Sequence, residues 1–155
     1  MSRVQLALNV PDIDEAVAFY SKLFAVEPNK RKPGYANFAI ADPPLKLVLF
    51  ENADAEARLN HLGVEVTSTD EVSAHQARLA EEGLAPVDES GTCCFAMQDK
   101  VWVDGPDGAW EIYTVLADSD DFGAASAHAA DFDTSEPAAD ALCCGSMPES
   151  AARCC

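Results

Sequence analysis

The sequence predicts a single α+β domain made of two βαβββ modules and followed by a disordered acidic tail. Three observations support this fold class: a strand motif that recurs 56 residues later, a helix signal after each copy, and a change of composition near Leu116. A length of 155 residues suits one domain. We expect the domain over residues 1–118, with modules at about 1–56 and 57–118, and the tail over 119–155.

The first module begins with a strand-like run, Gln5–Val10. Asp12 is placed to cap a following helix, with Glu15 three residues later. Two more strands are expected at Tyr35–Ile40 and Leu45–Phe50, separated by a turn that contains two prolines. The helix should bury one apolar face, formed by Ile13, Ala16, Val17, Tyr20, Leu23 and Phe24.

The second module repeats this order. His61–Val66 matches the first strand in length and spacing, and a helix over about 69–82 follows, which Gly83 can end. The remaining strands are expected near 93–97, 100–104 and 109–115, with a Gly-Pro-Asp-Gly turn before the last one. The helix after each copy supports an internal duplication more strongly than the six matched positions alone.

The charge of the chain excludes several classes of partner. The formal net charge is −17, so the surface repels phosphate backbones and anionic lipid, and neither nucleic acid nor membrane is expected as a partner. The first residues lack a basic segment followed by a long apolar one, and no apolar run approaches the roughly 20 residues of a membrane span. A cytoplasmic protein is therefore predicted.

The segment after Leu116 differs from the rest of the chain. Residues 117–155 hold eight acidic side chains, one arginine and eleven alanines. Such a composition buries too little apolar surface to offset the entropy lost on ordering, so disorder is predicted. The tail carries two cysteine pairs whose role the sequence leaves open between capture of thiophilic metals and a passive segment: Cys143, Cys144, Cys154 and Cys155.

Three polar residues at related strand positions suggest a metal site. Gln5 and His61 occupy equivalent places in the two modules, and Glu111 lies on the last strand between bulky apolar neighbours. A carboxylate buried there needs a charged partner, which a divalent cation supplies. Three N/O ligands on strands leave positions open, as in non-haem Fe(II) sites. Each residue alone would more often be an ordinary polar side chain; only their shared register favours a metal.

Cys93 and Cys94 are adjacent, which disfavours a disulfide between them. Neighbouring Cα atoms lie about 3.8 Å apart, below the usual disulfide range of roughly 4.4–6.8 Å. Two thiolates side by side are suited to holding one soft atom, because thiolates select thiophilic partners. The alternative is a pair of small buried apolar side chains.

Residues 3–116 resemble the vicinal oxygen chelate superfamily. More narrowly, the chain is similar to the organoarsenical C–As lyases of the ArsI type, some of which are called cadmium-induced proteins. The resemblance is carried by Val4–Val10, Lys32–Ile40, Asn60–Val66, Thr92–Ala96 with Gln98–Val103, and Trp110–Asp118. The paired cysteines beside the triad are its specific part. Where family members have histidine at the first ligand, this chain has Gln5.

The resemblance implies a cavity that holds Fe(II) on Gln5, His61 and Glu111, with Cys93 and Cys94 binding the substrate. It implies cleavage of the carbon–arsenic bond of trivalent methyl or aromatic arsenicals with O2 as co-substrate, by a monomer or a homodimer. Two alternatives stay open. One is a non-enzymatic cadmium- or arsenite-binding stress protein. The other is a different enzyme of the superfamily, such as an extradiol dioxygenase, a glyoxalase or a thiol transferase.

Overall fold

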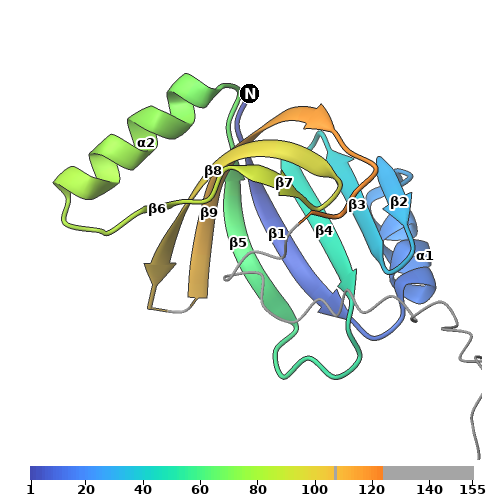
Figure 1. The fold of residues 1–155 in the computed structure, drawn as a ribbon. Coiled ribbons are helices and arrows are strands. Elements are labelled where there is room, and N and C mark those ends of the chain that lie inside the picture. The colour runs from blue at the N-terminus through green and yellow to red at the C-terminus, as the bar shows by residue number, and fades with distance from the viewer. Residues whose placement is uncertain (107, 124–155) are drawn as a thin grey trace, which may run out of the picture.

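The computed structural model describes residues 1–106 and 108–123. Its strands form one sheet in the order β2-β3-β4-β1-β5-β9-β8-β6, with β7 paired to β8 at one side (Figure 1). The elements are β1 (Arg3–Val10), α1 (Ile13–Phe24), β2 (Lys30–Lys32), β3 (Tyr35–Ile40), β4 (Leu45–Glu51), β5 (Leu59–Glu65), α2 (Thr69–Glu81), β6 (Val87–Asp88), β7 (Gly91–Cys93), β8 (Ala96–Gly105) and β9 (Gly108–Asp118).

The two halves of the sheet have the same topology. β1 and β5 pair antiparallel at its centre, β1 also pairs parallel with β4, and β5 pairs parallel with β9. Antiparallel pairs β3–β4 and β8–β9 extend each half outward. The predicted α+β fold with a βαβββ repeat is therefore confirmed, and the short strands β2 and β6 are additions that the sequence patterns did not predict.

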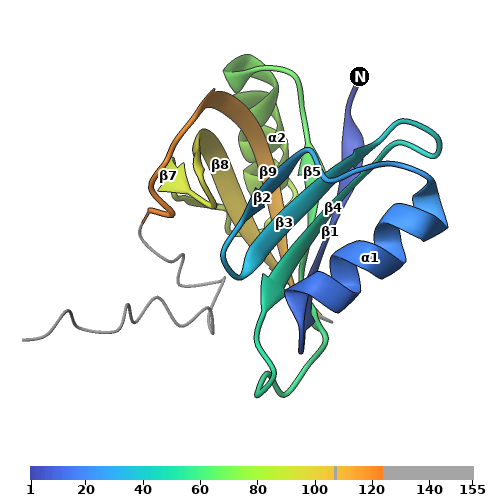
Figure 2. The ribbon, with the colours of Figure 1, turned by 90° about the vertical axis from the view of Figure 1, so that its right-hand side faces the viewer.

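Each helix covers the outer face of its own half of the sheet. Figure 2 shows α1 against the half that contains β3 and β4, whereas α2 lies beside β8 and β9. Because side chains alternate along a strand, the residues that pack under the helices leave every second residue for the inner face. The buried core under α1 comprises Val10, Ile13, Val17, Ala36, Phe38, Ile40, Leu47 and Leu49. The core under α2 comprises Val66, Val72, Leu79, Val101 and Ile112.

The helix ends follow the local signals in the sequence. The Asp12 carboxylate accepts a hydrogen bond from the Glu15 amide at 2.8 Å and caps α1, as predicted. Gly83 takes a positive φ of 79° immediately after α2. The predicted burial of Leu23 in the apolar face of α1 is wrong. This side chain is 57% exposed, because α1 turns it away from the sheet.

The region around the paired cysteines differs from the prediction. The strands expected at 93–97 and 100–104 are wrong in their bounds, since β7 ends at Cys93 and β8 is continuous from Ala96 to Gly105. Cys94 and Phe95 form the two-residue turn between them, with φ of 56° and 62°. Positive φ at both central residues gives the twist that a two-residue hairpin requires.

The start of the expected tail lies against this turn. The Ser119 amide donates to the Phe95 carbonyl at 3.0 Å, and Cys93 forms a β-bridge with Gly123. The Phe122 ring packs 5.4 Å from the Phe95 ring. The predicted disorder beyond residue 123 and the cysteine pairs 143–144 and 154–155 lie outside the described residues. Within the described residues, neither helix combines the length and the apolar character needed to cross a bilayer.

Candidate active site

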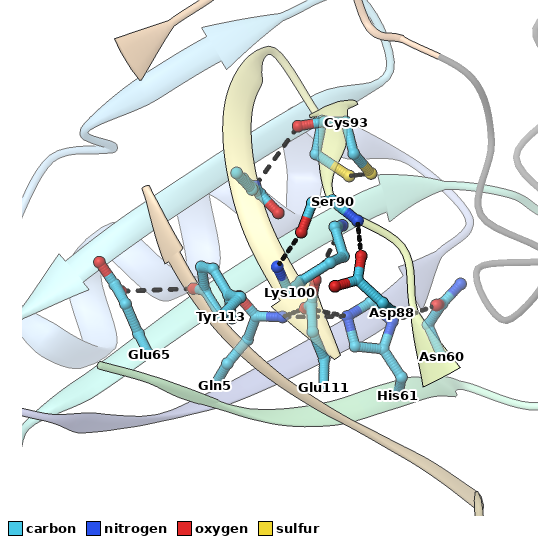
Figure 3. A network of polar contacts seen from close by, with 12 residues as sticks. Gln5, Asn60, His61, Glu65, Asp88, Ser90, Cys93, Lys100, Glu111 and Tyr113 are labelled. Carbon is cyan, nitrogen blue, oxygen red and sulfur yellow. Dashed lines mark hydrogen bonds and ion pairs between the residues drawn. The ribbon is translucent and has the colours of Figure 1, made fainter. Parts of the chain in front are cut away.

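The inner face of the curled sheet encloses one cavity of about 220 Å³, and all five predicted site residues line it. Gln5, His61 and Glu111 come from β1, β5 and β9, the three neighbouring strands at the centre of the sheet. Cys93 and Cys94 come from the β7–β8 hairpin, and Figure 3 shows Cys93 on the far side of Lys100 from Gln5, Glu111 and His61. The structure therefore brings together the two groups that the sequence suggested separately.

The three central side chains converge on one point. Gln5 Nε2 lies 2.9 Å from His61 Nε2 and 2.7 Å from Glu111 Oε2, and His61 Nε2 lies 3.4 Å from Glu111 Oε2. Neighbouring ligand atoms of an octahedral ion with bonds of about 2.1 Å are separated by similar distances. Each of these residues is only 4% exposed.

This donor set fits a divalent cation when the amide contributes. In the described residues no three His, Cys, Asp or Glu side chains are grouped to hold a metal ion, so Gln5 is needed as the third ligand. Its amide nitrogen now donates to Glu111. Rotating the Gln5 side-chain amide by half a turn would direct its oxygen toward the metal position instead. A neutral amide oxygen binds a divalent cation more weakly than a histidine nitrogen does.

A chain of hydrogen bonds sets the tautomer of His61. The Ala57 carbonyl can only accept, so it orients the Asn9 amide, which donates to it at 3.0 Å. Asn9 Oδ1 then accepts from Asn60 Nδ2 at 2.9 Å, and Asn60 Oδ1 lies 2.7 Å from His61 Nδ1. His61 Nδ1 therefore carries the proton and donates, which leaves the Nε2 lone pair directed toward the triad.

Lys100 connects the triad to the thiols. Its ammonium lies 2.9 Å from Glu111 Oε1, and the side chain is 2% exposed. Burial raises the pKa of Glu111, but the ion pair with the Lys100 ammonium lowers it by more, so the carboxylate stays ionised. Burial likewise lowers the pKa of Lys100, yet Glu111 and Cys93 raise it above its usual value, so the lysine stays charged. Lys100 was not predicted as a site residue; its position two residues before Trp102 on one strand, which puts both side chains on the same face, could have indicated it.

The turn places both sulfurs on one side. In an extended strand neighbouring side chains point to opposite faces, whereas here Cys93 Sγ and Cys94 Sγ lie 2.9 Å apart and both cysteines are free. The contact with Cys94 lowers the pKa of Cys93 to about 7 against the effect of burial, and Lys100 lowers it further. The same contact and burial raise the pKa of Cys94 well above its usual value. One thiolate therefore forms near neutral pH and accepts from the other thiol.

Aromatic rings surround the site. The Tyr35 and Phe95 ring centroids lie 5.3 Å apart beside the cysteine turn. At the triad, the His61 ring lies 5.0 Å from the Trp102 ring and 6.5 Å from the Phe50 ring. These rings give the cavity apolar walls beside its charged side chains.

Residues 3–113 match the family model of the glyoxalase/bleomycin resistance protein/dioxygenase superfamily. The chain belongs to this superfamily, as the fold and the resemblance predicted. Among named relatives, the cadmium-induced protein CadI of Mycobacterium bovis is 62% identical over 149 residues, which cover 95% of this chain and 96% of that protein. The trivalent organoarsenical cleaving enzyme of Thermomonospora curvata is 60% identical over 123 residues, covering 77% of this chain and 82% of that enzyme.

A solved structure supports the fold independently. The Mn(II)-bound glyoxalase of Novosphingobium aromaticivorans superimposes with a TM-score of 0.53 at 21% identity, covering 76% of this chain and 39% of that chain. At this level of identity the likeness concerns the fold alone.

Proposed function

We propose that this protein is an Fe(II)-dependent, dioxygen-using C–As lyase of the cytoplasm. Its substrates are trivalent organoarsenicals, either methylarsenite or aromatic arsenicals, and it releases inorganic arsenite. The observation that carries the proposal is the position of a vicinal dithiol and a Gln-His-Glu triad around one cavity. A relative that is 60% identical bears the name of an organoarsenical cleaving enzyme, which supports the same chemistry.

Cys93 and Cys94 hold the arsenic in this proposal. A monoalkyl As(III) has two exchangeable hydroxyl groups, so two thiols can replace both and leave the carbon substituent in place. The Cys93 thiolate attacks first, because its pKa is lowered to about 7. This attack displaces one hydroxyl as hydroxide, which takes a proton from solvent, and the Cys94 thiol then displaces the second hydroxyl, which leaves with the Cys94 proton as water. The two bonds fix the As–C bond relative to the triad, and that orientation replaces a random encounter.

Gln5, His61 and Glu111 would hold the iron. Bound Fe(II) would supply the reaction with dioxygen, which the side chains of this chain cannot perform. Lys100 keeps Glu111 ionised and in place, and the Asn9–Asn60 chain keeps the His61 lone pair available. The overall reaction balances: CH3As(OH)2 and O2 give As(OH)3 and formaldehyde.

The proposal is tested by loading the protein with Fe(II) without oxygen, adding methylarsenite, and following arsenite with and without air. Many molecules of arsenite per protein in air, and none without it, are expected.

The cadmium-induced relative makes soft-metal binding the second candidate, because that name indicates a cadmium response. Stoichiometric uptake without turnover would favour binding. Turnover of a catechol or of a glutathione adduct instead would favour another enzyme of the superfamily.

Replacing Asn60 with leucine should weaken Fe(II) binding by about 10- to 100-fold, the usual effect of losing a hydrogen bond that orients a metal-ligating histidine. Without Asn60 Oδ1, the His61 Nδ1 proton has no acceptor and the ring can reverse its tautomer. Iron affinity measured by competition with a chelator checks this. Asn29→Leu, in the cavity wall but outside this hydrogen-bond chain, is the control. Equal affinity in Asn60→Leu and wild type would refute the role.

A further inference from the structure

Lys46 borders the proposed metal site on the inner face of the sheet. It lies on β4 as the register partner of Gln5 on β1, and adjacent strands are about 4.8 Å apart. Both side chains line the same cavity. Lys46 is half-buried and its pKa is lowered by burial, so the cation is partly withdrawn from water.

The other cations that line the cavity already have carboxylate partners, and these pairs are Arg3–Glu65, Lys30–Asp118 and Lys100–Glu111. Lys46 forms no hydrogen bond or ion pair within residues 1–106 and 108–123. Glu65, the carboxylate that acts on it most strongly, is held by Arg3 at 2.7 Å. Among the described residues that line the cavity, Lys46 is therefore the one cation without a carboxylate partner.

A second polar group in the cavity wall also lacks a partner. Gln98 is 8% exposed, and its Oε1 accepts no hydrogen bond from any described residue. Its Nε2 lies 3.4 Å from the Cys93 carbonyl, which places this amide next to the substrate thiols. Buried polar atoms without partners are rare in native proteins, so this acceptor oxygen is placed to receive a hydrogen bond from a ligand or a water in the cavity.

We propose that Lys46 forms an anion subsite that selects aryl arsenicals(III) whose ring carries an anionic substituent, such as a carboxylate, at the end away from arsenic. This inference rests on the proposed function and deepens it by naming the substrate class. A cavity of about 220 Å³ accommodates a substituted ring, since an engineered cavity of about 150 Å³ holds benzene. Because Cys93, Cys94 and Lys46 line the same cavity, a ring on arsenic held by the two thiols would share that cavity with the Lys46 ammonium.

The test compares two probes that differ by one group, phenylarsenous acid and 4-carboxyphenylarsenous acid. Binding to the full-length, metal-free protein is measured by calorimetry without oxygen. Wild type should bind the carboxyphenyl probe about tenfold more tightly, the size expected for one charge-assisted hydrogen bond. Lys46→Met should remove this preference and leave the phenyl affinity unchanged, whereas Lys46→Arg should retain it. Lys22→Met on the outer helix α1 is the matched charge control.

The possible results separate the two proposals. If wild type binds both probes equally, or Lys46→Met weakens both by the same factor, the anion subsite is refuted and the C–As lyase stands. If neither probe binds to the thiols, as judged against Cys93→Ser, the proposed function itself fails and the subsite with it. The same ratio of about ten should appear in kcat/KM of the Fe(II)-loaded enzyme.

Discussion

Replacing Cys93 or Cys94 with serine should abolish arsenite release from methylarsenite while the iron content stays near that of wild type. Serine has the same shape, but its hydroxyl is a hard, weakly acidic group that does not hold As(III) as a thiolate does. Loss of the fixed orientation lowers the rate by at least about a hundredfold. Arsenic speciation by chromatography and metal analysis of the purified variants measure both quantities.

The same substitution elsewhere in the chain provides a matched control. Cys143→Ser changes one member of a tail pair and should leave turnover unchanged. Retained activity in both Cys93→Ser and Cys94→Ser would remove the thiols from the mechanism. Loss of iron in these variants would instead mean that the hairpin supports the metal site, because the sulfurs and the triad share one cavity.

Replacing Glu111 with alanine should remove the iron and also destabilise the metal-free protein by about 3–5 kcal/mol, the cost of leaving a buried charge without its partner. The Lys100 ammonium is 2.9 Å from Glu111 Oε1 and almost completely buried, so removing the carboxylate leaves a buried cation without its ion-pair partner. Chemical denaturation of the metal-free variants measures the free energy of unfolding.

Two further variants separate the effect of charge burial from the effect of metal loss. Lys100→Met in the Glu111→Ala background should recover a large part of the stability, because the unpaired cation is gone. His61→Ala should lose iron and activity with a smaller loss of stability in the metal-free protein, since it leaves the ion pair between Lys100 and Glu111 intact. A double variant as unstable as Glu111→Ala alone would contradict this account.

The central part of the fold could be predicted because its signals are local. The runs Gln5–Val10 and His61–Val66 repeat in the sequence, and the structure places them as β1 and β5, paired antiparallel at the centre of the sheet. Their equivalence predicted that Gln5 and His61 would converge, and their nitrogens lie 2.9 Å apart. A carboxylate between apolar neighbours on a strand marked Glu111 as buried, and it is 4% exposed.

Other features of the site depend on tertiary contacts. The turn at Cys94 and Phe95 was missed because neither residue favours positive φ, so the sequence lacks the Asn or Gly that usually marks such a turn. Lys100 meets Glu111 only after β8 and β9 pair. Lys46 can be identified as unpaired only from the tertiary structure, in which Arg3 binds Glu65 and Lys30 binds Asp118. No local pattern contains that information.

Arsenic X-ray absorption on Fe(II)-loaded protein mixed with methylarsenite without oxygen measures directly which atoms hold the arsenic. Arsenic should be bound by two sulfurs and one carbon, and the carbon signal should disappear when air is admitted. In the Cys93→Ser/Cys94→Ser double variant both sulfur signals should be absent. A carbon signal that persists in air with iron bound, or sulfur ligation unchanged in that variant, would contradict a dithiol and a ferrous site acting on one substrate.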